Sequence, residues 1–127
     1  MSQNARIGLA SVAAGPLFVL LAALADLYMR LPAPVVVDPR SVQLLLFLSV
    51  PALLVGTFVA LPINTIGAAA MLALGSVFAP ARTRTAWALA GAALGGVAVW
   101  LFEAEGQIGF ALVATSAFCG WGCSASD

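Results

Sequence analysis

Charged residues are gathered in a few short clusters, and the segments between these clusters are almost wholly apolar. Residues 7–25, 41–81, 85–102 and 106–126 contain no Asp, Glu, Lys or Arg. A helix that crosses a membrane needs about 20 mainly apolar residues, with a range of about 17–25. Each interval therefore fits one membrane-spanning helix, except 41–81, which is long enough for two.

This pattern predicts an all-α fold: a polytopic membrane helix bundle of four or five transmembrane helices in one domain, residues 1–127. The predicted spans are about 7–29, 42–61, 65–79, 86–102 and, in the five-helix version, 107–122. The last segment contains Thr115 and Ser116 and runs into glycines. The alternative for this segment is a re-entrant or interfacial tail, because it is shorter than a typical membrane-spanning helix.

Prolines mark the predicted connections. Three of them lie in residues 30–40 and exclude a regular helix there. At the end of this connection, Asp38 and Pro39 are residues typical of a helix N-terminus. Pro62 and Asn64 predict a tight turn between spans 42–61 and 65–79, with Asn64 as the N-cap of the following helix.

The arginines predict an orientation. With five spans, four of them share one side of the membrane: Arg30, Arg40, Arg82 and Arg84. The positive-inside rule then places this side in the cytoplasm, with the N-terminus outside and the C-terminus inside. Trp87 and Trp100 lie near the two ends of span 86–102, which is typical of an aromatic belt at both interfaces.

The first apolar segment also imitates a secretory signal peptide. Arg6, the apolar run and residues 23–25 (Ala-Leu-Ala) match its charged region, its apolar region and its cleavage site. Cleavage would leave Arg30 and Arg40 outside, against the positive-inside bias. We therefore expect this segment to remain as a transmembrane helix.

Composition supports the membrane assignment. The 127 residues are 63% hydrophobic and 8% charged, and the mean hydropathy is +1.10. A soluble domain carries about 25% charged residues, and disorder requires low hydrophobicity. The formal net charge is zero and no basic stripe is present, so a nucleic-acid partner is excluded. The expected partners are the lipid bilayer and other membrane helices.

Asp26 is the one ionisable residue placed within a predicted span. A carboxylate at depth costs about 2.5–3.5 kcal/mol on insertion scales and suggests an ion or proton site. However, Arg30 follows four residues later, so the two side chains can form a local ion pair near the helix end. We favour the ion pair over the functional site.

Small residues form one face of span 86–102, and similar residues recur in span 65–79. Small faces allow helix backbones to approach closely, either within one chain or between copies. The candidate packing residues are Ala88, Gly91, Gly95 and Gly96, together with Gly67 and Gly75. We expect spans 65–79 and 86–102 to pack on each other.

The sequence offers no catalytic set. It lacks His, so triads that need His are excluded, and no phosphate-binding glycine loop is present. Cys119 and Cys123 share a helix face, but metal binding would need further ligands. They are best interpreted as small buried side chains. We expect no enzymatic activity, no metal and no cofactor.

These observations favour a structural or assembly component of a membrane complex, or of a virion membrane, that associates with itself or with larger membrane proteins. One alternative is an oligomeric channel or small-solute transporter that uses Asp26 as its intramembrane site. A second alternative is a hole-forming lysis protein of similar size and hydropathy.

Overall fold

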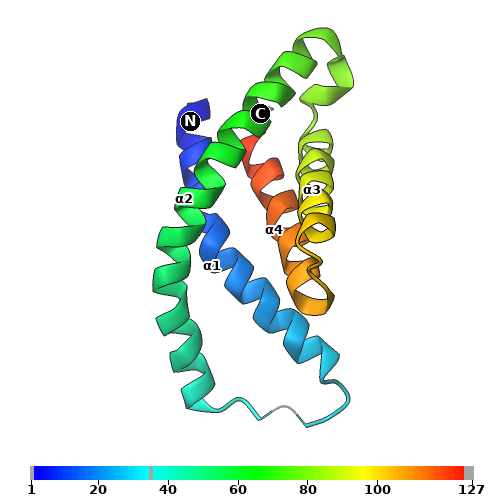
Figure 1. Ribbon diagram of the computed structural model, residues 1–127. Helices are drawn as coiled ribbons and strands as arrows, with labels where there is room; N and C mark the ends of the chain where they lie inside the picture. The colour runs from blue at the N-terminus through cyan, green and yellow to red at the C-terminus, as the bar shows by residue number, and fades with distance from the viewer. Residues whose placement is uncertain (1, 35, 125–127) are drawn as a thin grey trace.

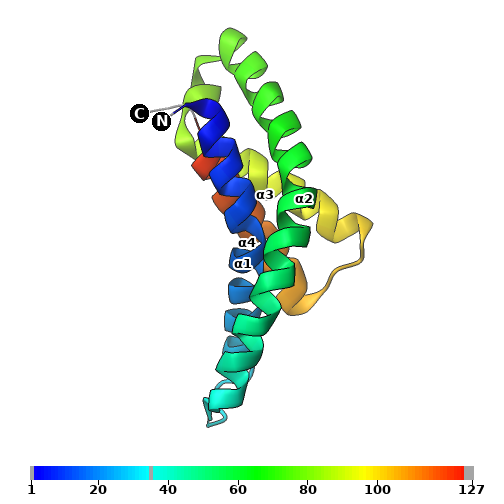
Figure 2. The same cartoon turned by 90° about the vertical axis from the view of Figure 1, so that its left-hand side faces the viewer.

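The computed structural model describes residues 2–34 and 36–124. Within these ranges the chain is all-α and contains no β-strand. The α-helices of this part of the chain are α1 (Gln3–Met29), α2 (Pro39–Val77), α3 (Arg84–Leu101) and α4 (Gly106–Cys123), and a short 3-10 helix, η1 (Ala79–Arg82), joins α2 to α3. Successive helices run in opposite directions (Figures 1 and 2).

Three of these helices, α1, α2 and α3, are long and apolar enough to cross a membrane. The predicted all-α membrane fold is therefore confirmed. The fourth helix, α4, has the same 18-residue length as α3. It lies between α1 and α3 and packs against both of them (Figure 1).

Side-chain caps explain where three helices begin. Asp38 is the N-cap of α2, as its sequence predicts, and accepts a hydrogen bond from the backbone N–H of Arg40 at 3.3 Å. Ser2 caps α1, and Thr83 caps α3 through the N–H of Ala86. Each cap satisfies a backbone donor that has no partner within the helix.

The predicted turn between spans 42–61 and 65–79 is wrong, because α2 is one continuous helix of 39 residues. Pro62 removes only one backbone donor, and the remaining hydrogen bonds continue on both sides. Asn64 does not cap a helix. Its amide instead donates a hydrogen bond to the hydroxyl of Ser11 on α1, at 3.0 Å.

The continuous α2 also changes the predicted orientation. With four antiparallel helices, the start of α1 and the end of α4 lie at the same end of the bundle (Figure 1). This differs from the predicted five-span arrangement, which places the first and last helix ends at opposite ends of the bundle. Arg30 and Arg40 lie at one end, whereas Arg82 and Arg84 lie at the other.

Helices α1 and α2 cross where small residues meet. A Cβ added to Gly15 would overlap the backbone carbonyl of Ala52, and one added to Gly56 would lie 2.6 Å from the Cα of Gly15. Only glycine permits this approach. Ser11, one turn before Gly15, is fully buried at the same crossing.

Helices α3 and α4 are in equally close contact. A Cβ added to Gly91 would overlap the carbonyl of Ser116, and one added to Gly95 would lie 2.8 Å from the Cα of Val113. Gly120 on α4 faces the carbonyl of Trp87 in the same way. The small face of α3 therefore packs on α4, and the expectation that it packs on segment 65–79 is wrong.

A stripe of small residues on α4 is buried: Ala111, Thr115, Cys119 and Cys123. The spacing of four residues places them on one face. Both cysteines are free and buried, as predicted. Trp87 packs with Ala68 and Cys123 and is only 4% exposed. It is therefore a core residue rather than part of an aromatic belt, whereas Trp100 is exposed.

Arginines hold helix C-termini at the end of the bundle where α1 begins. Arg6 donates to the carbonyl of Ser124 at 2.6 Å, and Arg82 donates to that of Gly75 at 2.8 Å. Gln3 also donates to the carbonyl of Cys123. The last carbonyls of a helix lack internal partners and carry partial negative charge, so these donors stabilise the ends of α2 and α4.

Candidate functional site

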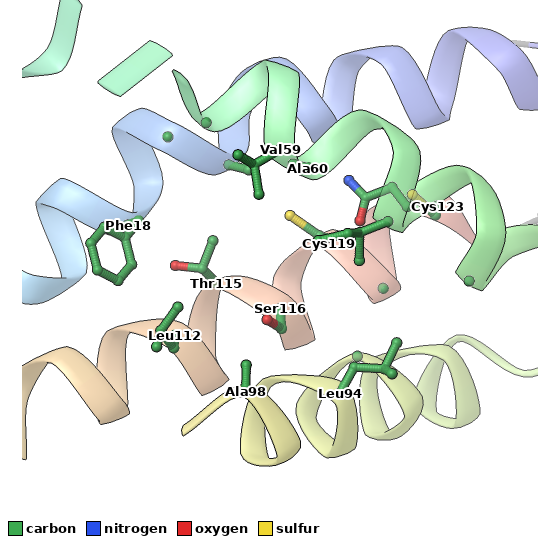
Figure 3. A pocket seen from close by; sticks show the side chains of 18 of the residues that line it. Phe18, Val59, Ala60, Leu94, Ala98, Leu112, Thr115, Ser116, Cys119 and Cys123 are labelled. Carbon is green, nitrogen blue, oxygen red and sulfur yellow. The ribbon is translucent and has the colours of Figure 1, made fainter. Parts of the chain in front are cut away.

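The candidate site is an apolar cavity of about 530 Å³ lined by residues from all four α-helices. It lies between α2 and α3, and side chains of α4 form its floor (Figure 3). Phe18 of α1 lies at one end of the lining residues (Figure 3). The cavity exists because α3 packs on α4 and α1 packs on α2 and α4, which leaves α2 and α3 apart.

Small residues keep this space open. Gly67 and Gly91 line the cavity from opposite walls. A Cβ added to Gly67 would have the Cδ1 of Leu94, 3.9 Å away, as its nearest neighbour. This is ordinary van der Waals contact, so the α2 and α3 walls come close to each other at Gly67 and Leu94.

The few polar side chains on the wall differ in their hydrogen bonding. Asn64 donates to Ser11, and the thiol of Cys119 donates to the carbonyl of Ala10 at 3.6 Å. Thr115 is 8% exposed, and its hydroxyl oxygen has no hydrogen-bond partner. Its side chain projects from α4 into the cavity in Figure 3. No Asp, Glu, Lys or Arg is among the lining residues.

The structure separates the small residues that the sequence grouped together. Gly91 and Gly95 are buried against α4, and Gly67 faces the cavity. Gly75 is next to the side chain of Arg82. A Cβ added to Gly96 would have no neighbouring atom within 4 Å. Ala88, the remaining candidate, is partly buried on α3.

Asp26 does not lie on the cavity wall. It forms an ion pair with Arg30 at the end of α1, at 2.9 Å between Oδ2 and Nε, and the two side chains are 40% and 69% exposed. The pair follows the predicted spacing of four residues. A half-exposed carboxylate that is paired with a neighbouring arginine needs no bound ion to account for its position.

Metal ions are held by clusters of several side chains that supply ligands. Among residues 2–34 and 36–124, no three His, Cys, Asp or Glu side chains are close enough to hold a metal ion. The cavity can accommodate apolar groups. Thr115 and Ser116 are the hydroxyl-bearing residues on its wall, and the hydroxyl oxygen of Thr115 is buried.

Sequence reasoning missed two features of this region. The crossing of α1 and α2 had a signal, since Ser11 and Gly15, and Ala52 and Gly56, are small residues four positions apart. The unpaired hydroxyl of Thr115 had none, because a threonine in an apolar helix normally bonds its own backbone. Comparison with protein-family models, curated proteins and solved structures finds no match to this chain.

Proposed function

We propose that this chain is a non-enzymatic component of a membrane assembly and that α2 is the element through which it docks to neighbouring membrane helices. The assembly is either a protein complex in a cell membrane or the membrane of a virus particle. The observation that supports the proposal is the length of α2 compared with that of its partners in the bundle.

Helix α2 is too long for one simple crossing. Its 39 residues extend about 58 Å at 1.5 Å per residue, whereas the hydrocarbon core is about 30 Å thick. Helices α3 and α4, with 18 residues each, extend about 27 Å and match it. Tilt and bending relieve part of such a mismatch, and association with other helices relieves the rest.

Large apolar side chains are exposed on α2 from its first third to its last residue. Phe47, Phe58 and Val77 are 78%, 81% and 85% exposed, and these positions are spread from the first third of the helix to its last residue. α1 and α2 also extend beyond the turn that joins α3 to α4 (Figure 1). The apolar pair that projects there is the surface that a neighbouring helix would cover.

The alternative of a channel or transporter has less support. Its intramembrane site was to be Asp26, which is exposed and paired with Arg30. A transporter also commonly uses interrupted helices to line its path, whereas α2 is continuous through Pro51 and Pro62. The lysis-protein alternative predicts that the host is killed when this chain is expressed alone.

The test is purification in mild detergent, with the mass of the intact complex as the measurement. Wild-type protein is expected in a complex larger than one copy. The double variant Phe47→Ala and Phe58→Ala is expected to lose the complex. The matched control Phe110→Ala and Phe118→Ala removes two exposed phenyl groups from α4 and should keep it. A monomeric wild-type protein, or equal loss in both variants, contradicts the proposal.

A further inference from the structure

A second pocket lies at the end of the bundle where α2 connects to α3 through η1 (Figure 1). Its volume is about 390 Å³, and its wall comes from the last turns of α2, from η1 and from the start of α3. Met71, Leu72 and Trp87 supply the large apolar side chains of this wall. Among the described lining residues, Arg82 is the one charged side chain. The pocket therefore combines apolar walls with a guanidinium group.

The guanidinium group of Arg82 is held in place through its Nε atom. The side chain lies against α2 at Gly75, where its Cγ would be 3.3 Å from an added Cβ, and its Nε donates to the Gly75 carbonyl at 2.8 Å. Within residues 2–34 and 36–124, its two Nη groups have no hydrogen-bond partner. They are donors in a fixed planar arrangement that suits a phosphate group.

The other arginines at this end of the bundle contact α4 rather than the pocket. Arg6 donates to the carbonyl of Ser124, and Arg84 lies over the ring of Trp121, with 5.5 Å between the guanidinium carbon and the ring centroid. Arg82 is thus the arginine of this end whose side chain lines the pocket.

The pocket crosses the boundary between lipid headgroups and acyl chains. Helix α3 has 18 residues and extends about 27 Å, which matches a hydrocarbon core of about 30 Å. Arg82 precedes α3 by two residues and is therefore at the level of the headgroups. Trp87 lies about 5 Å along α3 from Arg84, on the hydrocarbon side of this boundary.

From this geometry we propose that the pocket binds an anionic phospholipid of the surrounding leaflet. The phosphate bonds to the Nη groups of Arg82, and an acyl chain lies against Met71, Leu72 and Trp87. Basic pockets between transmembrane helices recognise anionic headgroups in this way. A zwitterionic lipid carries its own cation beside the phosphate, so the charge of Arg82 favours the anionic lipid. The site is separate from the docking surface proposed for α2 and does not depend on it.

Trp87 provides the readout, because it lines the pocket. The experiment uses the full chain in mixed micelles of a neutral detergent, with Trp100→Phe and Trp121→Phe so that Trp87 alone fluoresces. The probe is phosphatidylglycerol brominated in the upper half of its acyl chains, and the comparison probe is phosphatidylcholine with the same chains. We expect half-maximal quenching of Trp87 by phosphatidylglycerol at a concentration about threefold to fivefold lower, as for one exposed ion pair.

Two matched pairs of variants separate the charge from the apolar wall. Arg82→Gln should abolish the preference for phosphatidylglycerol, whereas Arg84→Gln removes the same charge from the same end and should keep it. Ser76→Phe places a ring in the pocket and should weaken quenching by both lipids. Ala73→Phe adds the same ring at an exposed position of α2 outside the lining residues and should quench like the parent.

Equal quenching by the two lipids in the parent protein would overturn the proposal. An unchanged preference in Arg82→Gln, or an equal loss in Arg84→Gln, would do the same, because it would show diffuse attraction to the charged end. Glycerol phosphate carries the anion without acyl chains, so its competition at millimolar concentration would reject a lipid site. If a second copy covers the pocket, both lipids will quench Trp87 weakly and equally until the complex dissociates, and this outcome also rejects the lipid.

Discussion

At the scale of single residues, the effect of a glycine depends on what a methyl group would meet at its position. Gly91 and Gly96 are both on α3 and both belong to the small-residue segment of the sequence. A Cβ on Gly91 would overlap the backbone of Ser116, whereas a Cβ on Gly96 would meet nothing within 4 Å. The two glycines look alike in the sequence, but the fold has room for a methyl group at Gly96 and none at Gly91.

This difference predicts the outcome of a matched pair of substitutions. Gly91→Ala should destabilise the bundle by about 1–3 kcal/mol, because α3 and α4 must move apart. Gly96→Ala should be neutral or stabilise by up to about 1 kcal/mol, because alanine is the better helix former. Unfolding in mixed detergent measures both values. Equal effects at the two positions would show that α3 does not pack on α4 through Gly91.

Asp26 yields a second prediction at this scale. Its ion pair with Arg30 is largely exposed, and exposed pairs of this kind contribute about 0–1 kcal/mol. Asp26→Asn should therefore change stability in the same detergent assay by less than about 1 kcal/mol, with Arg30→Gln giving a change of similar size. A loss of several kcal/mol would mean that the carboxylate is held at depth and has a further role.

At the scale of elements, the charge-free intervals were sufficient to predict where helices lie. Helices α1, α3 and α4 begin and end within a few residues of the segments 7–29, 86–102 and 107–122. Segment limits were predictable because caps and charges mark them. The continuity of α2 was not, because Pro62 and Asn64 are turn signals in water, and here α1 supplies Ser11 as the partner of Asn64.

The continuity of α2 gives a third prediction. In a chain without its two native cysteines, Ile63→Cys should resist a membrane-impermeant maleimide, because it lies within a helix well away from both ends. Ala79→Cys, in the connection after α2, is the matched control and should react. If the maleimide labels both positions, Ile63 lies in a water-exposed turn, as the sequence suggested, and not in a continuous membrane helix.

Packing partners were harder to predict than helices. The small residues of segments 65–79 and 86–102 suggested one interface, whereas the structure places Gly91 against α4 and leaves Gly67 on a cavity wall. A face of small residues indicates only that another helix approaches closely, and it does not identify that helix. Which helix approaches depends on the connections. Segment 65–79 contacts α3 at Trp87, through Ala68 and Met71, whereas the glycines of α3 pack on α4.

At the scale of the whole molecule, the two ends of the bundle differ in charge. The end that contains the start of α1 carries Arg6, Arg82 and Arg84 among the described residues. The opposite end carries Arg30 and Arg40, together with the acidic side chains Asp26, Asp38, Glu103 and Glu105. Orientation in a membrane follows the arginines in short connections, and acidic residues contribute little. The bias is therefore three arginines against two.

This bias predicts that both chain ends face the cytoplasm. A fluorescent protein that matures only in the cytoplasm should report from either terminus, whereas the five-span arrangement places the N-terminal fusion outside. Because the bias is small, Arg82→Gln with Arg84→Gln reverses it to one against two and should invert a measurable share of the molecules. Arg30→Gln with Arg40→Gln removes the same number of charges from the other end and should leave orientation unchanged. Inversion by the second pair alone would place the termini outside.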